Sequence, residues 1–225
     1  MKLPACIMVI AALAGFSPAA PQPALLSAQP DPLAIVRRAG SVYRSMTSLQ
    51  ADFIQIIEDA RMGDSLKSAG KLYQAGPNGF AMRFTDPPDD AIILDGRHAW
   101  FYNPSTAPGQ VIRTSMESDP VYGVNLLGRI LDRPAERYYA TWIRRDTVGG
   151  RRVDVVAIVP RAANVNFSRA VLWIDTEDAL PRRIELEEAP GARRVLILSR
   201  IRPNATIPRE LFEFTLPKGV RIVDQ

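Results

Sequence analysis

The sequence predicts a mainly β domain with a few helices. In the stretch 71–104, Phe80, Met82 and Phe84 alternate with Ala81 and Arg83, which is the period of a half-buried strand. The dipeptide at 95–96, Asp-Gly, is a strong hairpin signal between apolar runs. Short apolar runs separated by Pro, Asp or Gly also fill the second half of the chain. Strands of this number and spacing predict a β-sandwich or a β-barrel, either closed or open along one side.

The first residues are predicted to form a leader that precedes the folded domain. Lys2 comes before an apolar run, Cys6 to Phe16, that is too short to span a bilayer. Ser17-Pro18-Ala19 offers a small-x-small cleavage site, so we predict a signal peptide over 1–19, with an approximate cut. An Ala/Pro spacer follows over 20–30, and a single domain over 31–225. Cleavage would remove the only cysteine, and with it any thiol or disulfide chemistry.

Two helices are predicted among the strands. Asp31-Pro32 supplies an N-cap and a proline at the first helical position, and apolar residues follow at helical spacing. These residues are Ile35, Val36, Ala39, Val42, Tyr43 and Met46. Asp119-Pro120 repeats the start signal before a second apolar stretch that contains Leu126, Leu127, Ile130 and Leu131. The pattern alone does not distinguish a helix that plugs a barrel end from one that forms a movable lid.

The remaining elements are predicted as strands in chain order. The ranges are 49–57, 66–74, 80–84, 91–94, 98–102, 138–145, 151–159, 171–174, 184–188, 195–201 and 211–214. Gly149-Gly150 is predicted to turn one hairpin. The segment 86–90, with two prolines, is predicted to lie outside the sheet, because proline lacks the ladder donor.

Composition argues against several classes of function. The formal net charge is +4, or +3 without Lys2, and acidic and basic residues are interleaved, so no nucleic-acid partner is expected. His98 is the only histidine, which leaves no triad and no set of zinc ligands. Asp89-Asp90 is interpreted as a solvated turn rather than a catalytic pair. We therefore predict no enzyme activity, no metal and no cofactor.

What is left is apolar surface on the predicted strands. It could be an ordinary core, because a barrel of about eight strands can be filled by its own side chains, whereas a larger or flattened one can enclose a ligand. Composition does not choose between these alternatives. The candidate cavity residues are Phe53, Ile57, Phe80, Met82, Phe84, Ile92, Leu94 and Trp100.

Four motifs, in order along the chain, resemble the periplasmic outer-membrane lipoprotein carrier family, LolA. They are Leu49-Gln50-Ala51-Asp52-Phe53-Ile54-Gln55; Pro77-Asn78-x-Phe80; Asp95-Gly96-x-x-x-Trp100-Phe101-Tyr102-Asn103-Pro104; and Phe212-x-Phe214-x-x-Pro217-x-Gly219-Val220. The resemblance implies an incompletely closed antiparallel β-barrel with a helical lid over a hydrophobic cavity. The implied lid residues are Val36, Val42, Tyr43, Leu126, Leu127 and Ile130. It also implies a monomeric periplasmic carrier of acylated lipoproteins. An inner-membrane ABC exporter would deliver the lipoprotein to it, and an outer-membrane lipoprotein receptor would accept the lipoprotein from it.

One position departs from the family pattern. Family members commonly carry an arginine before Pro-Asn that is tied to lid closure and cargo hand-over, whereas Ala75-Gly76 stands here. Lys71 and Arg83 are the nearby candidates to replace it. The departure keeps open a second hypothesis, a binding protein for free lipid or another apolar small molecule. A third hypothesis is an interaction protein with a filled barrel and no cavity.

Overall fold

The computed structural model describes residues 29–59, 63–76, 79–115, 125–162, 167–188 and 191–225. The predicted leader and most of the Ala/Pro spacer lie outside the described residues, as does the predicted start signal at 119–120. Within the described residues, no helix combines the length and the apolar character needed to cross a membrane.

Strands dominate the described chain, as predicted. The elements are α1 (Pro32–Ser45), β1 (Ser48–Asp59), β2 (Asp64–Ala75), β3 (Gly79–Asp86), β4 (Pro88–Asp95), β5 (His98–Tyr102), β6 (Gln110–Ser115), α2 (Leu126–Leu131), α3 (Pro134–Arg137), β7 (Tyr138–Val148), β8 (Arg151–Pro160), β9 (Phe167–Asp175), β10 (Pro181–Glu188), β11 (Ala192–Pro203), the 3₁₀ helix η2 (Arg209–Phe212) and β12 (Arg221–Asp224).

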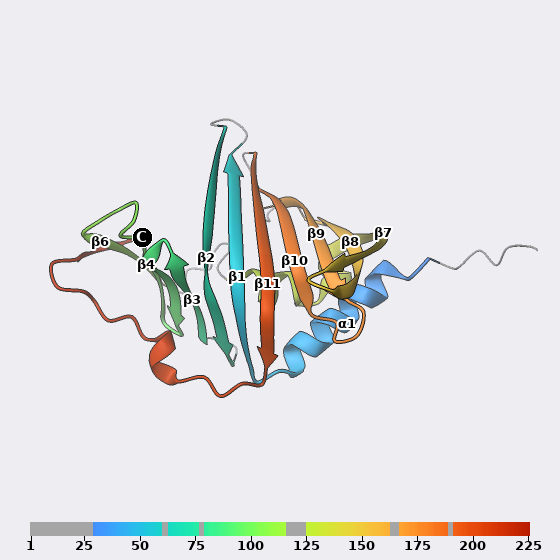
Figure 1. Ribbon diagram of the computed structural model, residues 1–225, viewed down its shortest axis with the longest axis horizontal. Coiled ribbons are helices and arrows are strands. Elements are labelled where there is room, and N and C mark those ends of the chain that lie inside the picture. The colour runs from blue at the N-terminus through green and yellow to red at the C-terminus, as the bar shows by residue number, and fades with distance from the viewer. Residues whose placement is uncertain (1–28, 60–62, 77–78, 116–124, 163–166, 189–190) are drawn as a thin grey trace, which may run out of the picture.

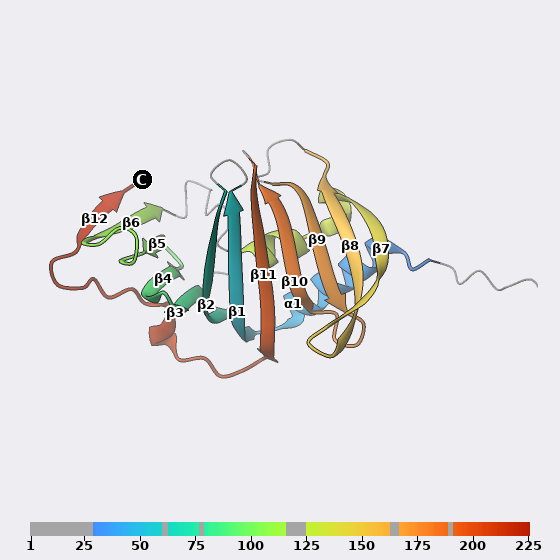
Figure 2. The same ribbon diagram turned by 45° about the horizontal axis from the view of Figure 1, so that its top comes forward.

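The described strands form a single curved sheet that does not close on itself (Figure 2). Its order is β12-β6-β5-β4-β3-β2-β1-β11-β10-β9-β8-β7, so β12 and β7 are the two edges. Neighbouring strands are antiparallel except for β12 and β6, which run parallel. The predicted open, mainly β architecture is confirmed.

Helix α1 begins where the sequence predicts. The Asp31 carboxylate accepts a hydrogen bond from the backbone N–H of Leu33 at 2.9 Å, and Pro32 occupies the first turn. The helix lies against one side of the sheet (Figure 1), and its apolar stripe is buried there. A Cβ at Gly40 would lie 2.5 Å from the carbonyl oxygen of Leu131, so only glycine permits this close approach to α2.

The helices define two faces of the sheet. We call the face covered by α1 and α2 the inner face; it carries the largest apolar cluster, to which β1–β5 and β7–β11 all contribute. The opposite, outer face carries two smaller clusters, one around Trp173 and one around Ile93 and Phe212.

The predicted loop over 86–90 is wrong in two respects. Strand β4 begins at Pro88, directly after Pro87, so most of the segment 86–90 belongs to the sheet. Pro88 fits because the first residue of a strand is one of the places where a sheet tolerates the missing donor. Asp90 is also buried rather than solvated: its carboxylate accepts hydrogen bonds from the Ser105 hydroxyl at 2.7 Å, the Ser105 backbone N–H at 3.1 Å and the Asn103 amide at 3.3 Å.

The C-terminal segment also differs from the prediction. Residues 211–214 are not a strand; η2 occupies 209–212, and the chain then continues to β12 at one edge of the sheet (Figure 2). Phe212 is buried in the outer-face cluster, and the Arg83 guanidinium donates to the carbonyl oxygens of Leu211 at 3.0 Å and Glu213 at 3.3 Å. These contacts use backbone carbonyls that a strand would need for its ladder.

Candidate functional site

The inner face brings most of the predicted cavity residues together. Phe53, Phe80, Met82 and Leu94 are buried in the inner-face cluster, and their exposed fractions are 5% or less. Phe84 and Ile92 are partly buried and pack against this cluster. Because residues two apart on a strand share a face, the alternation seen in the sequence places them on the same side as the helices.

Gly70 shapes the centre of this face. It pairs with Phe53 on β1 and with Phe84 on β3, and it contributes no side chain between them. The two phenyl rings therefore meet across β2, edge to face, with their centroids 5.1 Å apart. Edge-to-face contacts of this kind are among the favoured arrangements of aromatic pairs.

Two predicted cavity residues lie apart from the cluster. Trp100 lies on the outer face, where it pairs with Ile93 and stacks on Phe214 at 5.0 Å, so it does not lie with the other candidate cavity residues. Phe101, the next residue, faces inward and packs against the inner cluster. Ile57 lies on the inner face but is only partly buried, because it is close to the end of β1.

The predicted lid residues come from two helices that pack on the same cluster. Val36, Tyr43, Leu127 and Ile130 are buried in it, and Val42 packs against it at the margin. For Leu126 only the helical backbone is described. The stripe predicted on α1 therefore covers the inner face together with α2.

A polar contact that the sequence did not predict ties the two helices to the sheet. The Tyr43 hydroxyl lies between the side-chain carbonyl oxygens of Gln74 on β2 and of Asn125, the latter at 3.1 Å. Asn125 is also the N-cap of α2 and accepts from the Gly128 backbone N–H at 2.9 Å. Burial raises the pKa of Tyr43 to about 12, although both amide contacts act to lower it. The phenol is thus a neutral hydrogen-bond donor that joins α1, α2 and β2.

The candidates to replace the family arginine do not reach the lid. Arg83 points to the outer face, where it donates to the carbonyl oxygens of the segment around η2. Lys71 is exposed and lines a groove on the outer face next to Asp52 and Arg200. The polar contact that the structure does show between the helices and β2 is the Tyr43 bridge. The signal that could have indicated it is Asn125, a favoured N-cap residue directly before the apolar stretch of α2.

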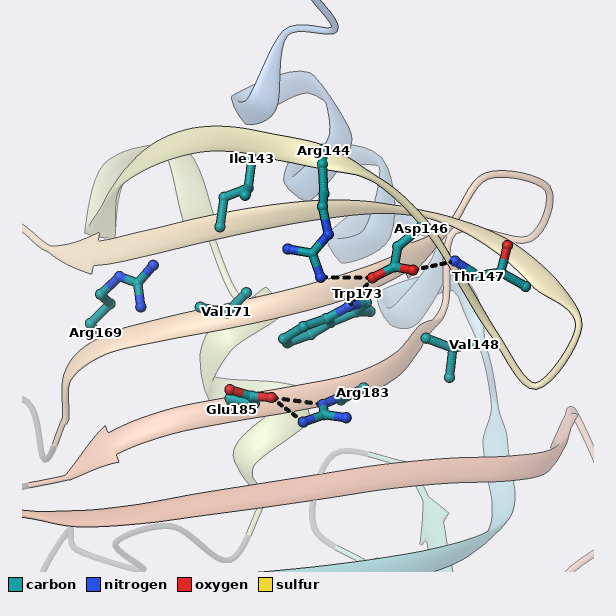
Figure 3. A pocket seen from close by; sticks show the side chains of 10 residues that line it. All are labelled: Ile143, Arg144, Asp146, Thr147, Val148, Arg169, Val171, Trp173, Arg183 and Glu185. Atoms are coloured by element: carbon teal, nitrogen blue, oxygen red, sulfur yellow. Dashed lines mark hydrogen bonds and ion pairs between the residues drawn. The ribbon is translucent and has the colours of Figure 1, made fainter. Parts of the chain in front are cut away.

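A separate groove of about 550 Å³ lies on the outer face between β7 and β10 (Figure 3). Trp173 lies at its centre, under the Arg183 guanidinium at 4.9 Å, and its indole N–H donates to Asp146 at 3.3 Å. Arg144 pairs with Asp146 at 2.8 Å, and Arg183 pairs with Glu185. The positive charges of Arg144 and Arg183 at the centre of this groove are therefore already neutralised by carboxylates.

Comparison with known proteins identifies the family. The profile described as "Outer membrane lipoprotein carrier protein LolA" matches residues 44–215. An outer-membrane lipoprotein carrier protein from Alkalilimnicola ehrlichii is 28% identical over 182 residues, which cover 81% of this chain and 80% of that protein. The corresponding protein from Shewanella loihica is 25% identical over 80% of this chain and 81% of its own length.

Solved structures agree on the fold. An uncharacterized conserved protein from Thermus thermophilus superimposes with a TM-score of 0.54 at 14% identity, over 86% of this chain and 98% of that one. MucB, in its complex with MucA from Pseudomonas aeruginosa, gives a TM-score of 0.50 at 16% identity, over 84% of this chain and 62% of that one. At such identities the likeness concerns the fold alone. Since the family profile spans most of the domain that carries the apolar inner face, this chain belongs to the LolA family of outer membrane lipoprotein carrier proteins.

Proposed function

We propose that this protein is a periplasmic carrier that shields the acyl chains of lipoproteins and moves them from the inner membrane to the outer membrane. The observation that supports it most is the apolar inner face of an open sheet, covered by two short helices, in a chain of this family. The predicted signal peptide over 1–19 is consistent with export, and the carrier role requires no catalytic group.

A comparison of free energies favours burial of the acyl chains as the main source of cargo affinity. Burying one acyl chain of about fifteen methylenes is worth roughly 12 kcal/mol, at about 0.8 kcal/mol per methylene. A net hydrogen bond contributes about 1 kcal/mol. Release into water would therefore be slow, so the chains should pass directly to another apolar site. An inner-membrane ABC exporter as donor and an outer-membrane lipoprotein receptor as acceptor meet this requirement.

The test compares two forms of one lipoprotein. The mature carrier is incubated with the acylated and the non-acylated form, and co-purification is measured for each. The acylated form alone should be retained. Equal, negligible retention of both forms would contradict the proposal.

Binding of free lipid is the second candidate, and one observation favours it. The arginine that the family resemblance ties to hand-over is replaced by Ala75-Gly76, and Arg83 is engaged on the outer face. Native mass spectrometry of protein taken from the periplasm separates the two candidates. A free lipid mass without any lipoprotein would favour the second, and failure to take up a solvatochromic lipid probe would favour a filled interior.

A further inference from the structure

We propose that Arg194 is a binding residue for the carbonyl oxygens that join acyl chains to their headgroup. This inference rests on the proposed function and adds a polar subsite to it. Arg194 lies on β11, where Leu196 and Leu198 share its face and are buried in the inner cluster. It pairs with Ile57 on one side and Leu186 on the other, so it faces the same side as the apolar surface.

Arg194 lies at the end of the inner face that is far from α1. Helix α1 lies at one end of the sheet, where Arg38 donates to the carbonyl oxygens of Thr176 and Glu177 between β9 and β10. Arg194 lies near the start of β11, at the opposite end of the strands. Its side chain is 26% exposed, so it borders the apolar surface and is still accessible.

The guanidinium is held in place and keeps donors to spare. Its Nε donates to Glu188 at 2.9 Å, and its two terminal nitrogens donate to Glu188 at 3.3 Å and to Gln55 at 3.2 Å. A guanidinium has five N–H donors, so two remain that bond to no side chain or backbone group within the described residues. Glu188 neutralises the positive charge, so an anionic headgroup gains little here, whereas an uncharged carbonyl acceptor gains a charge-assisted hydrogen bond.

The sequence alone does not single out Arg194. Glu188 and Arg194 belong to a stretch of mixed charge that is typical of a solvated surface. The neighbouring Arg193 fits that interpretation, since it lies on the outer face and pairs with Glu58 and Glu185, each at 2.8 Å. Period-two alternation from Leu198 back to Arg194 places the second arginine inside.

The test compares a diacylated lipopeptide with its dialkyl ether analogue, which has the same chains but no ester carbonyls at the linkage. Affinity is measured by displacement of a solvatochromic probe. The unaltered protein should bind the ester form about tenfold more tightly, as expected for one hydrogen bond from a charged donor. Arg194→Met should remove that preference and leave the affinity for the ether form unchanged. Arg193→Met, the matched control on the outer face, should keep the preference.

The outcomes separate this inference from the proposed function. Equal losses for the ester and the ether form in Arg194→Met, or an unaltered protein without ester preference, would overturn the subsite and leave the carrier role standing. If the unaltered protein binds neither the ester nor the ether lipopeptide, both the subsite and the carrier role are contradicted. If thermal melting shows that Arg194→Met does not fold, the double variant Glu188→Gln/Arg194→Met is used in its place, because it also removes the carboxylate that the single variant leaves unpaired. A diacylglycerol with the same chains distinguishes free lipid from lipoprotein as the source of the carbonyl.

Discussion

At the residue scale, Gly70 marks a place where two strands approach too closely for any other side chain. A Cβ there would lie 2.2 Å from the carbonyl oxygen of Arg83 and 2.8 Å from the Cα of Phe84. Backbone atoms cannot turn aside as a flexible side chain can, so β2 and β3 would have to separate. The contact between Phe53 and Phe84 on the inner face depends on this spacing.

Gly70→Ala should lower the free energy of unfolding by about 3 kcal/mol, the upper part of the usual range for overpacking. The matched control is Gly109→Ala. That glycine has a φ of +77° and open space around its Cβ position, so the substitution should cost only about 1 kcal/mol, from backbone strain. Urea denaturation of the two variants measures both values. Similar losses at the two positions would contradict the close approach at β2.

Asp175 gives the stability a predictable dependence on pH. Burial alone would raise the pKa of this carboxyl, but hydrogen bonds from Arg151 at 2.7 Å, the Glu177 backbone N–H at 2.8 Å and Arg182 at 3.1 Å outweigh it and lower the pKa to about 2. Because the folded-state pKa is below the ordinary value of 3.8, the stabilisation is present above that pH and is lost as the pH falls toward 2.

The loss should amount to about 2 kcal/mol of unfolding free energy between about pH 5 and pH 2. Denaturation curves of the unaltered protein and of Asp175→Asn, recorded across that range, provide the measurement. The variant should be less stable at the upper end and should lose less on acidification. Parallel curves for the two proteins would show that another carboxyl is responsible.

At the scale of elements, the phenol of Tyr43 is the one described side chain that contacts both the N-cap of α2 and strand β2 from α1. Tyr43 contacts Gln74 and Asn125, and the Arg44 guanidinium donates to the Leu131 carbonyl oxygen at 3.1 Å. The remaining contacts of the helices with the inner face are largely apolar and non-directional. The hydroxyl therefore fixes the position of the helices more than it contributes to their burial.

Tyr43→Phe should lower the free energy of unfolding by about 1–2 kcal/mol, because the part-buried amide oxygens of Gln74 and Asn125 lose the one hydroxyl donor that they share. Hydrogen exchange in α2 should become faster, since the Asn125 cap loses its support. Tyr139→Phe is the control, because Tyr139 is 59% exposed and its ring faces Arg161 rather than the helices. Unchanged exchange in α2 would show that the apolar contacts alone hold the helices.

At the scale of the whole molecule, cargo binding should depend on the apolar character of the inner face. Met82 is 5% exposed in the middle of the inner-face cluster. Met82→Glu should leave the protein folded, with a lower melting temperature, and should abolish retention of the acylated lipoprotein. An acyl chain can enter only if it removes water from the carboxylate, which is costly.

Thr85→Glu places the same charge on β3 at an exposed position that lines a groove of the outer face, so it should retain cargo. Thermal melting and lipoprotein capture on the same preparations decide the matter. Full cargo capture by a folded Met82→Glu protein would exclude residue 82 from the binding route, whereas an unfolded variant would place it in a sealed core.

The sequence by itself determined the elements whose signals are local. The Asp31 cap and Pro32 define the start of α1, and Gly149-Gly150 defines the hairpin of β7 and β8. Period-two alternation identified most strands, including those that carry Phe53 and Met82. It also indicated which residues of a strand share a face, and most of the candidate cavity residues do lie on the inner face. These features depend on neighbours a few residues apart, so they can be read without knowing the fold.

Only the tertiary structure decided which face is inside and which distant segments meet. Alternation divides β5 into two faces, but only pairing with β4 shows that Phe101 and not Trp100 faces the helices. The Tyr43 bridge and the burial of Phe212 likewise join segments far apart in the chain. β12 was not predicted because it pairs in parallel with β6, a strand more than a hundred residues earlier, where Arg113 also binds Asp224 across a separation of 111 residues. Such pairings depend on where the whole chain brings two segments, and no local pattern records that.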